Sequence, residues 1–185
     1  MKKSTIIIII VVVLLSGWMW SGYNSFITAH EAVDGSWAQV ETQYQRRIDL
    51  IPNLVSTVKG AADFEKSTFV EVTEARTKWM DAGNRTEKVS AANGMEGALA
   101  RLMLTFENYP TLQATQAYRD LMTQLEGTEN RIAVSRRDYN DIVRIYNVRV
   151  KRFPALILAK LFGFGSEEFF EAEEGAEDAP DVNFE

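Results

Sequence analysis

The side chains in this sequence best placed for chemistry are charged and amide groups that border its apolar stripes. They are Arg46, Arg47, Asp49, Asn53, Glu129, Asn130, Arg136 and Asn140. A buried arginine needs a carboxylate or carbonyl partner, because leaving it unpaired costs about 3–5 kcal/mol. We therefore interpret the set as a structural polar network between helices, for example Arg46 or Arg47 against Glu129. The alternative is a binding surface or an enzyme site that uses Arg46, Asp49 and Glu129.

The rest of the sequence offers little to a catalytic mechanism. It has no cysteine, which excludes disulfides, thiolate metal sites and cysteine nucleophiles. Its one histidine, His30, belongs to no zinc or di-iron motif, and we expect it at the surface. Gly163-Phe164-Gly165 lacks the further glycines of a phosphate-binding loop. The sequence therefore predicts no catalytic residue, no metal site and no cofactor.

The element that comes first in the chain is a long apolar segment. Residues 4–30 contain no Asp, Glu, Lys or Arg, and residues 6–15 are all isoleucine, valine or leucine. About 20 apolar residues in a helix cross a hydrocarbon core of about 30 Å. Trp18, Trp20 and Tyr23 would then lie at the interface that amphipathic aromatic side chains prefer. We predict a transmembrane helix over about residues 5–27, within a membrane anchor of residues 1–29.

A cleaved signal peptide is the alternative for this segment. Cleavage sites need small residues, whereas Ser16-Gly17 is followed by Trp18, Met19 and Trp20, so we favour a retained anchor. Trp18 also stands where a lipoprotein would need a cysteine. Two lysines precede the segment, so the positive-inside rule predicts a cytoplasmic N-terminus. We expect a single-pass protein of the cytoplasmic (inner) membrane with its helical body outside the cytoplasm.

Beyond the anchor the apolar pattern is helical. A stripe from Val33 to Val58 repeats at steps of three and four. It passes through Pro52, where we expect a kink or a break at Ile51, because proline removes a backbone hydrogen bond. A second stripe covers residues 64–80 and ends at a turn at Gly83-Asn84. A weaker stretch around residues 93–97 precedes a third apolar face over residues 99–106.

The most regular pattern comes next. Seven-residue spacing joins Tyr118, Leu125, Ile132, Tyr139, Tyr146 and Phe153, and the complementary position holds Leu121, Thr128, Ser135 and Ile142. Such a heptad seam predicts a long helix packed along its neighbours. We interpret the small side chains of Thr128 and Ser135 as a site of close helix approach. The alternative is a buried, hydrogen-bonded layer that fixes the register.

The last two segments are a short apolar helix over residues 155–164 and an acidic tail over residues 166–185. Leu158, Phe162, Phe164 and Phe184 carry more apolar surface than a monomer usually exposes, and we interpret them as self-association contacts. The alternative is that they fold back onto their own bundle. Without the tail the chain is slightly basic, and it shows no clustered nucleic-acid patch.

Several short stretches resemble signatures of the bacterial LemA family. They are Trp37–Glu41, Gln45–Val55, Glu107–Pro110, Thr128–Ile132, Arg136–Asn140, Tyr146-Asn147 and Pro180–Phe184. The resemblance implies a membrane anchor followed by an antiparallel bundle of long helices, with no established enzymatic activity and no cofactor. It also implies genes nearby for membrane metalloproteases or TPM-domain proteins, which makes such proteins candidate partners.

Together these patterns predict an all-α protein. We expect an N-terminal transmembrane helix followed by an up-and-down antiparallel bundle of about four long helices over residues 30–165. The expected function is that of a non-catalytic, self-assembling scaffold or adaptor that organises envelope or membrane proteins. The alternatives are an accessory factor to a membrane protease and an enzyme or ligand-binding protein. The expected partners are the lipid bilayer, further copies of the chain and other membrane proteins, and not nucleic acid.

Overall fold

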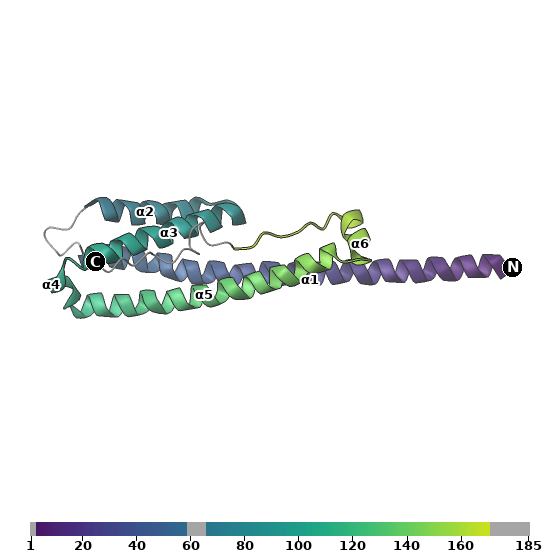
Figure 1. The fold of residues 1–185 in the computed structure, drawn as a ribbon, viewed down its shortest axis with the longest axis horizontal. Coiled ribbons are helices and arrows are strands. Elements are labelled where there is room, and N and C mark those ends of the chain that lie inside the picture. Colours follow the sequence, from purple (N-terminus) through teal and green to yellow (C-terminus); the bar gives the residue numbers. More distant parts are fainter. Residues whose placement is uncertain (1–2, 59–65, 171–185) are drawn as a thin grey trace, which may run out of the picture. The chain divides into compact units, whose positions relative to one another are not determined.

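The computed structural model describes residues 3–58 and 66–170 of the chain. These residues form helices and connecting turns without a strand among them, so the predicted all-α fold is confirmed. In chain order the helices are α1 (Lys3–Val58), α2 (Lys66–Asp81), α3 (Arg85–Phe106), α4 (Pro110–Gln113), α5 (Gln116–Lys151) and α6 (Ala155–Phe162) (Figure 1). The long helices of the bundle are α1, α2, α3 and α5, with 56, 16, 22 and 36 residues.

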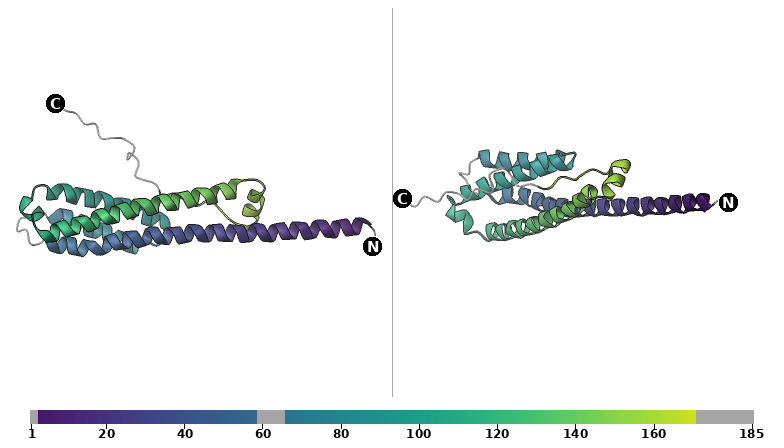
Figure 2. Two further views of the ribbon diagram at one scale, coloured as in Figure 1. Left: turned by 90° about the horizontal axis from the view of Figure 1, so that it is seen from below. Right: turned by 45° about the vertical axis from the view of Figure 1, so that its right-hand side comes forward.

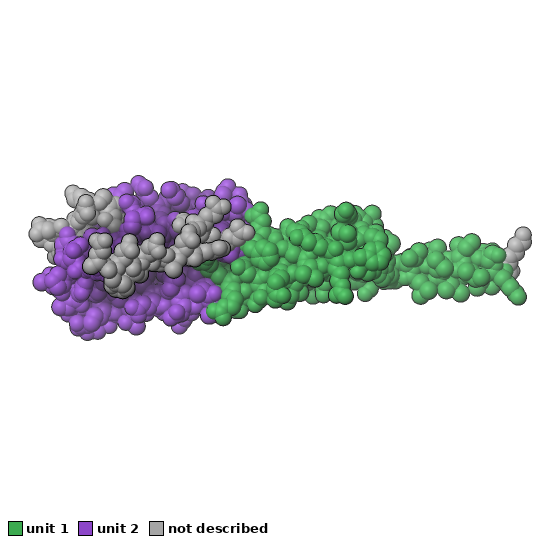
Figure 3. All heavy atoms as spheres, viewed as in Figure 1, with its two compact units in different colours: residues 1–40, 135–169 green, residues 41–134, 170–185 purple. Residues whose placement is uncertain are grey.

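The chain divides into two compact units (Figure 3). Among the described residues, unit 1 consists of residues 3–40 and 135–169, and unit 2 consists of residues 41–58 and 66–134 with Phe170. α1 and α5 each contribute to both units. Each unit has its own set of buried apolar side chains.

In unit 1, α1 and α5 run antiparallel (Figure 2). Trp37 contacts Tyr139 with ring centroids 5.3 Å apart, and His30 contacts Tyr146 at 5.7 Å. Residue numbers therefore fall along α5 as they rise along α1. Val33, on the apolar stripe that the sequence shows, is fully buried in this pair.

In unit 2, the second part of α1 packs with α2, α3 and the first part of α5. The Tyr44 ring stacks on Trp79 of α2 with centroids 4.6 Å apart, and its hydroxyl donates to Glu96 of α3 at 2.6 Å. Phe106 of α3 meets Tyr118 of α5 at 5.4 Å. The core of this unit is thus built from side chains of all four long helices.

The turn between α2 and α3 lies where it was predicted, at Gly83-Asn84. Asn84 Oδ1 accepts from the Glu87 backbone N–H at 2.9 Å, and the Glu87 carboxylate accepts from the Gly83 N–H at 2.7 Å. An N-terminal side-chain cap of this kind stabilises a helix by about 1 kcal/mol. α3 then continues through Gly94 and Gly97, because residues on both sides of them are buried in the core.

α1 continues without interruption past Pro52, so of the kink or break expected there the break at Ile51 is wrong. A proline inside a helix costs about 3 kcal/mol. Ile51 is 1% exposed and Leu54 is fully buried, so the apolar stripe is in contact with the core on both sides of the proline. Burial of each such side chain contributes about 1.5–3 kcal/mol, which together outweighs the lost hydrogen bond.

The apolar seam of α5 drifts along the helix. Leu125, Ile132, Tyr139 and Tyr146 are buried as predicted, but the complementary position after Ser135 is filled by Val143 and not by Ile142. Ile142 is only half-buried and Phe153 is 76% exposed, so their assignment to the seam is wrong. A straight helix has about 3.6 residues per turn, which rotates a strict heptad by about 20° in each repeat.

The N-terminal part of α1 is long and apolar enough to cross a membrane once. Residues 6–15 are 45–67% exposed, and none of the apolar window is buried in the protein. Helical backbone satisfies its own hydrogen bonds, so a helix with such side chains is suited to lipid. The helix does not end at the predicted end of the span, residue 27, but continues into the bundle.

α6 turns back from the end of α5 onto α1. Leu158 and Ala159 are its buried residues, and Leu158 packs so closely on Gly22 that a Cβ added there would lie 2.3 Å from Leu158 Cδ1. Gly163 ends the helix with φ of 79°, a left-handed conformation that glycine adopts without steric cost. Glycine at position 22 therefore allows the approach, and glycine at position 163 redirects the chain.

Candidate functional site

One ion pair of unit 2 joins the buried Arg47 on α1 to Glu129 on α5. Arg47 Nη2 donates to Glu129 Oε2, and the two side chains are 8% and 50% exposed. Arg47 Nε and Nη1 are buried with no hydrogen-bond partner within the described part of the chain. The guanidinium thus depends on a single carboxylate, which makes the pair costly to break.

The other residues of the predicted network lie elsewhere. Arg46, Asp49, Asn53 and Asn130 are exposed, and Arg136 and Asn140 are half-buried in unit 1. Asp49 Oδ1 accepts from Gln45 Nε2 at 2.8 Å, one turn earlier on the same helix. Of the alternative enzyme site at Arg46, Asp49 and Glu129, only Glu129 belongs to the buried pair.

Tyr44 makes several of the polar and aromatic contacts of unit 2. Besides its contacts with Trp79 and Glu96, its ring lies parallel to that of Phe170, with centroids 6.0 Å apart. The Lys88 ammonium lies 5.2 Å from the centroid of Trp79. Phe170 is 3% exposed, so the chain after α6 contributes to the core of unit 2. These groups are engaged in holding helices together.

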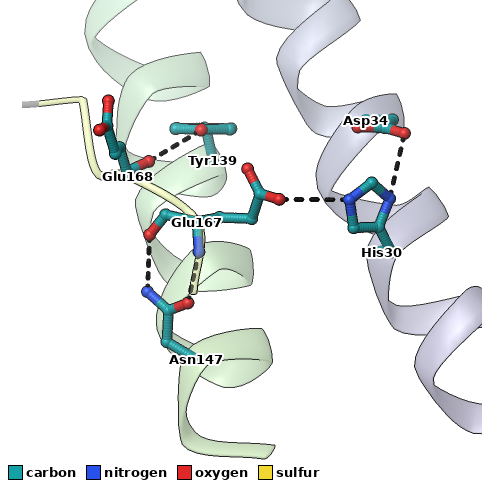
Figure 4. A network of polar contacts seen from close by, with 6 residues as sticks. All are labelled: His30, Asp34, Tyr139, Asn147, Glu167 and Glu168. Atoms are coloured by element: carbon teal, nitrogen blue, oxygen red, sulfur yellow. Dashed lines mark hydrogen bonds and ion pairs between the residues drawn. The ribbon is translucent and has the colours of Figure 1, made fainter. Parts of the chain in front are cut away.

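A second polar cluster lies in unit 1 around His30 (Figure 4). His30 Nδ1 lies 3.4 Å from Asp34 Oδ2, and His30 Nε2 lies 3.2 Å from Glu167 Oε1. Asp34 is one turn further along α1, whereas Glu167 belongs to the segment after α6. Each ring nitrogen of the histidine therefore faces one carboxylate, and the histidine joins α1 to the segment after α6.

We call residues 163–169 the strap. It lies along α5, held by Asn147, whose Nδ2 donates to the Glu167 carbonyl and whose Oδ1 accepts from the Glu167 N–H, both at 2.8 Å. The Tyr139 hydroxyl donates to the Glu168 carbonyl at 2.9 Å. Residues 166–169, which their acidic composition assigned to a solvated tail, are thus bonded to α5 because buried side chains supply the hydrogen bonds that water would otherwise provide.

Tyr146 lies beside this cluster and is 1% exposed. Its hydroxyl has no hydrogen-bond partner among the residues that the structure describes. Burial raises the pKa of the Tyr146 hydroxyl, and the nearby carboxylates of Glu167 and Asp34 raise it further. Tyr146 is therefore a neutral core side chain at ordinary pH.

A cavity of about 390 Å³ opens next to the cluster. It is lined by Ile27, His30, Glu31, Tyr146, Phe162, Gly163, Phe164, Gly165 and Glu167. This lining includes a histidine and carboxylates that can exchange protons, but it has no Ser, Thr or Lys nucleophile. Within the described ranges no group of three His, Asp or Glu side chains is arranged to hold a metal ion.

The residues expected to mediate self-association mostly pack inside unit 1. Leu158 is 3% exposed, and Phe164 stacks on Phe26 with centroids 5.0 Å apart. Phe162 meets the edge of Tyr23 at 5.0 Å and is 39% exposed. This is the fold-back arrangement that the sequence left as an alternative. Phe184 lies outside the described residues.

Sequence reasoning does not bring His30, Asn147 and Glu167 together. Spacing links residues only within one helix, and these three come from α1, α5 and the strap. His30 looked like a surface residue and Glu167 like part of a solvated tail. The one usable sign was the presence of Phe169 and Phe170 in an acidic segment, since apolar side chains there favour docking.

Comparison with known proteins supports the family resemblance. The family model described as LemA family matches residues 36–184. Magnetosome protein MamQ 2 of Paramagnetospirillum magneticum is 32% identical, over 85% of this chain and 67% of the relative. Magnetosome protein MamQ of Magnetospirillum gryphiswaldense is 31% identical with the same coverage. Protein LemA of Metamycoplasma hominis is 22% identical over 82% of this chain and 69% of its own length. The chain therefore belongs to the LemA family.

Proposed function

We propose that this protein is a membrane-anchored, non-catalytic helical scaffold or adaptor that organises other membrane or envelope proteins. The observation that carries the proposal is the continuity of α1. Its first part is a candidate membrane span, and its last part is a core helix of unit 2. One uninterrupted helix therefore joins a lipid-suited segment to a folded helical body.

The polar groups support an architectural role. The buried pair of Arg47 and Glu129 and the bonds between Asn147 and the strap join segments that are far apart in the sequence. Groups committed to such contacts are not free to bind a substrate. Two of the relatives are named after the magnetosome and not after a reaction, which agrees with this role.

The proposed setting is the cytoplasmic membrane, with the N-terminus inside and the helical body of residues 30–165 outside. Lys2 and Lys3 before the apolar segment support this orientation. The scaffold further self-associates in this proposal, through exposed apolar side chains such as Ile145 and Val148 of α5, which are 58% and 54% exposed. A protease added outside the membrane should then digest residues 30–165 in sealed cells with a permeable outer layer. Full protection of these residues would mean that the helical body lies in the cytoplasm.

Crosslinking in native membranes tests the scaffold role. The full chain is crosslinked mildly, solubilised and purified, and its partners are identified by mass spectrometry, with the variant Ile145→Ser/Val148→Ser as a matched control. We expect homo-oligomeric products that the control weakens, together with specific membrane proteins. Membrane metalloproteases and TPM-domain proteins are the first candidates, because the family resemblance suggests them.

Two results would count against the scaffold. One is a particle in nanodiscs that contains a single copy of the chain and crosslinks to no other protein. The other is an enzymatic turnover that His30→Gln abolishes while the helical content stays the same. His30 is the residue to test because it combines a titratable ring, two carboxylate neighbours and a position on the cavity wall.

A further inference from the structure

We propose that α6 is an interfacial helix whose exposed apolar face enters the boundary between headgroups and acyl chains of the bilayer that α1 spans. The inference rests on the proposed membrane span of α1 and adds a second lipid contact to it. The anchor is near the N-terminus, whereas α6, which makes this second contact, is near the C-terminus. All of the residues involved belong to unit 1.

α6 meets α1 at the level where the proposed span ends. Leu158 packs on Gly22, and Phe162 meets Tyr23 at 5.0 Å between ring centroids. A helix rises about 1.5 Å per residue, so a span that begins near Thr5 has crossed a hydrocarbon core of about 30 Å near residue 25. α6 therefore packs on α1 where the helix leaves the core, beside the aromatic residue that marks the interface.

The direction of α6 also suits the interface. In Figures 1 and 2, α6 runs across α1 and not along it. If α1 crosses the bilayer, a short helix that runs across it at this level lies along the interface. Amphipathic helices adopt this position, with the apolar face buried about 5–10 Å into the boundary region.

One face of α6 is left uncovered. Leu158, which packs on Gly22 of α1, and Ala159 are buried, whereas Ile157 and Leu161 are 52% and 62% exposed. The latter two are four residues apart and share one side of the helix. Phe153, in the turn before α6, is 76% exposed. Three large apolar side chains thus lie uncovered next to the membrane-exit segment.

The segment around α6 is basic. Residues 142–166 contain no acidic residue, and their basic residues are Arg149, Lys151, Arg152 and Lys160, with Arg144, which pairs with Asp141 at 3.1 Å. Arg149 Nη1 donates to the Ser25 carbonyl at 2.9 Å, which keeps this basic segment at the exit of the span. Basic side chains beside an apolar face bind anionic headgroups, each contributing about 1 kcal/mol near the surface.

A second copy of the chain is the competing occupant of this face. A specific protein interface buries about 800 Å² on each partner. Two side chains of an eight-residue helix and one from a turn supply far less than that. Lipid needs no shape complementarity and is already present at this level, so the bilayer is the occupant that the contacts favour.

Spin labelling in vesicles tests the inference on the full chain. Because the sequence has no cysteine, single-cysteine variants carry one nitroxide each. Leu161→Cys and Ile157→Cys report on α6, and Leu14→Cys reports on the span. Val134→Cys is the matched control, since Val134 is as exposed as Ile157 but belongs to unit 2. The vesicles contain phosphatidylcholine with a minor fraction of phosphatidylglycerol, and collision with oxygen and with a soluble nickel chelate is measured.

We expect the labels at 161 and 157 to lose collisions with the nickel chelate and keep those with oxygen, as the label at 14 does, while the label at 134 stays open to nickel. If 14 is in lipid but 161 and 157 behave like 134, the α6 inference is overturned and the span stands. If 14 also collides freely with nickel, both are overturned. If 161 loses both kinds of collision and shows spin–spin broadening, a second copy covers the face and the inference is wrong.

Discussion

At the scale of single residues, Arg47 is a charged side chain that is buried in the core of unit 2. Its neighbour Arg46 carries the same charge but points to solvent, because only position 47 lies on the buried side of α1 with Tyr44 and Ile48. Within the described residues, the carboxylate that pairs with the Arg47 guanidinium is that of Glu129. A matched pair of adjacent arginines therefore separates the effect of burial from that of charge.

Breaking this pair should destabilise the protein strongly. We expect Glu129→Gln to cost about 3 kcal/mol, the lower end of the usual penalty for a stranded charge, because Glu129 is half exposed. Thermal unfolding in detergent measures the loss. The double variant Arg47→Met/Glu129→Leu should recover most of it, because an apolar pair leaves no buried charge. Arg46→Met is the control and should change stability by less than about 0.5 kcal/mol. A loss in Arg46→Met as large as that in Glu129→Gln would contradict this account.

Because the pKa of Tyr146 is raised in the folded state, we expect the protein to lose stability at high pH. The pKa of Tyr146 in the folded state lies above its unfolded value of about 10. The contribution of neutral Tyr146 to the free energy of unfolding is therefore fully present below about pH 10, and it is lost as the pH rises through the folded-state pKa. Tyr146→Phe should weaken this alkaline loss while leaving stability at neutral pH unchanged, since the hydroxyl has no partner to lose in the described structure. Unfolding measured from neutral to alkaline pH tests both parts.

Tyr139 is the natural control for that experiment. Its hydroxyl donates to the Glu168 carbonyl, so Tyr139→Phe should cost about 1 kcal/mol at neutral pH, where Tyr146→Phe costs nothing. An alkaline transition that is identical in the wild-type chain and in Tyr146→Phe would show that other groups cause it.

At the scale of elements, one amide holds the strap to α5 through two hydrogen bonds. Asn147 is 7% exposed and makes two hydrogen bonds to the Glu167 backbone. We expect Asn147→Ala to cost about 1–3 kcal/mol and to increase hydrogen exchange of the strap amides, because each bonded group is left unsatisfied. Asn130→Ala, an exposed position on the same helix, should change neither. Unchanged exchange in Asn147→Ala would show that the aromatic contacts hold the strap alone.

The drift of the α5 seam leads to a second prediction about an element. Val143 is fully buried, whereas the adjacent Ile142 is half-buried. Val143→Ala should cost about 2 kcal/mol through lost burial and the cavity left behind, and Ile142→Ala should cost less although it removes more atoms. Chemical unfolding of both variants decides the register. A larger effect at position 142 would restore the strict heptad.

At the scale of the whole molecule, α1 has a lipid-suited first part and a last part that packs in the core of unit 2. The intact chain should remain in the membrane fraction after alkaline carbonate washing, because residues 6–15 have only apolar side chains and no cover from protein. A fragment that begins at Ser21 should be released. Release of the intact chain would contradict the anchor, and so would a mature protein that begins at or after Ser21.

A second fragment separates anchoring from packing. Starting the chain at Glu31 removes Phe26, which is 1% exposed and stacks on Phe164. We expect this fragment to be about 3–5 kcal/mol less stable than the one that begins at Ser21, in line with the loss of a buried phenylalanine. Equal thermal unfolding of the two fragments would mean that α6 and the strap do not depend on α1.

The sequence by itself determined the features that are carried by neighbouring residues. The uncharged apolar run predicted the membrane-suited part of α1, periodic stripes predicted the long helices, and Gly83-Asn84 predicted the turn between α2 and α3. Short family signatures led to the same fold. These features are local, since a helix is defined by contacts three and four residues apart.

Only the tertiary structure decided which side chains meet. Spacing placed Arg46 and Arg47 equally near Glu129, and burial against the core of unit 2 selected Arg47. The helix continued through Pro52 because packing on both sides outweighed a local penalty. Glu167 came to His30 and Asn147 because α6 folds back onto Gly22, a contact between segments at opposite ends of the chain. Such contacts depend on the summed free energy of packing and not on any one residue's propensity, which is why no local pattern contains them.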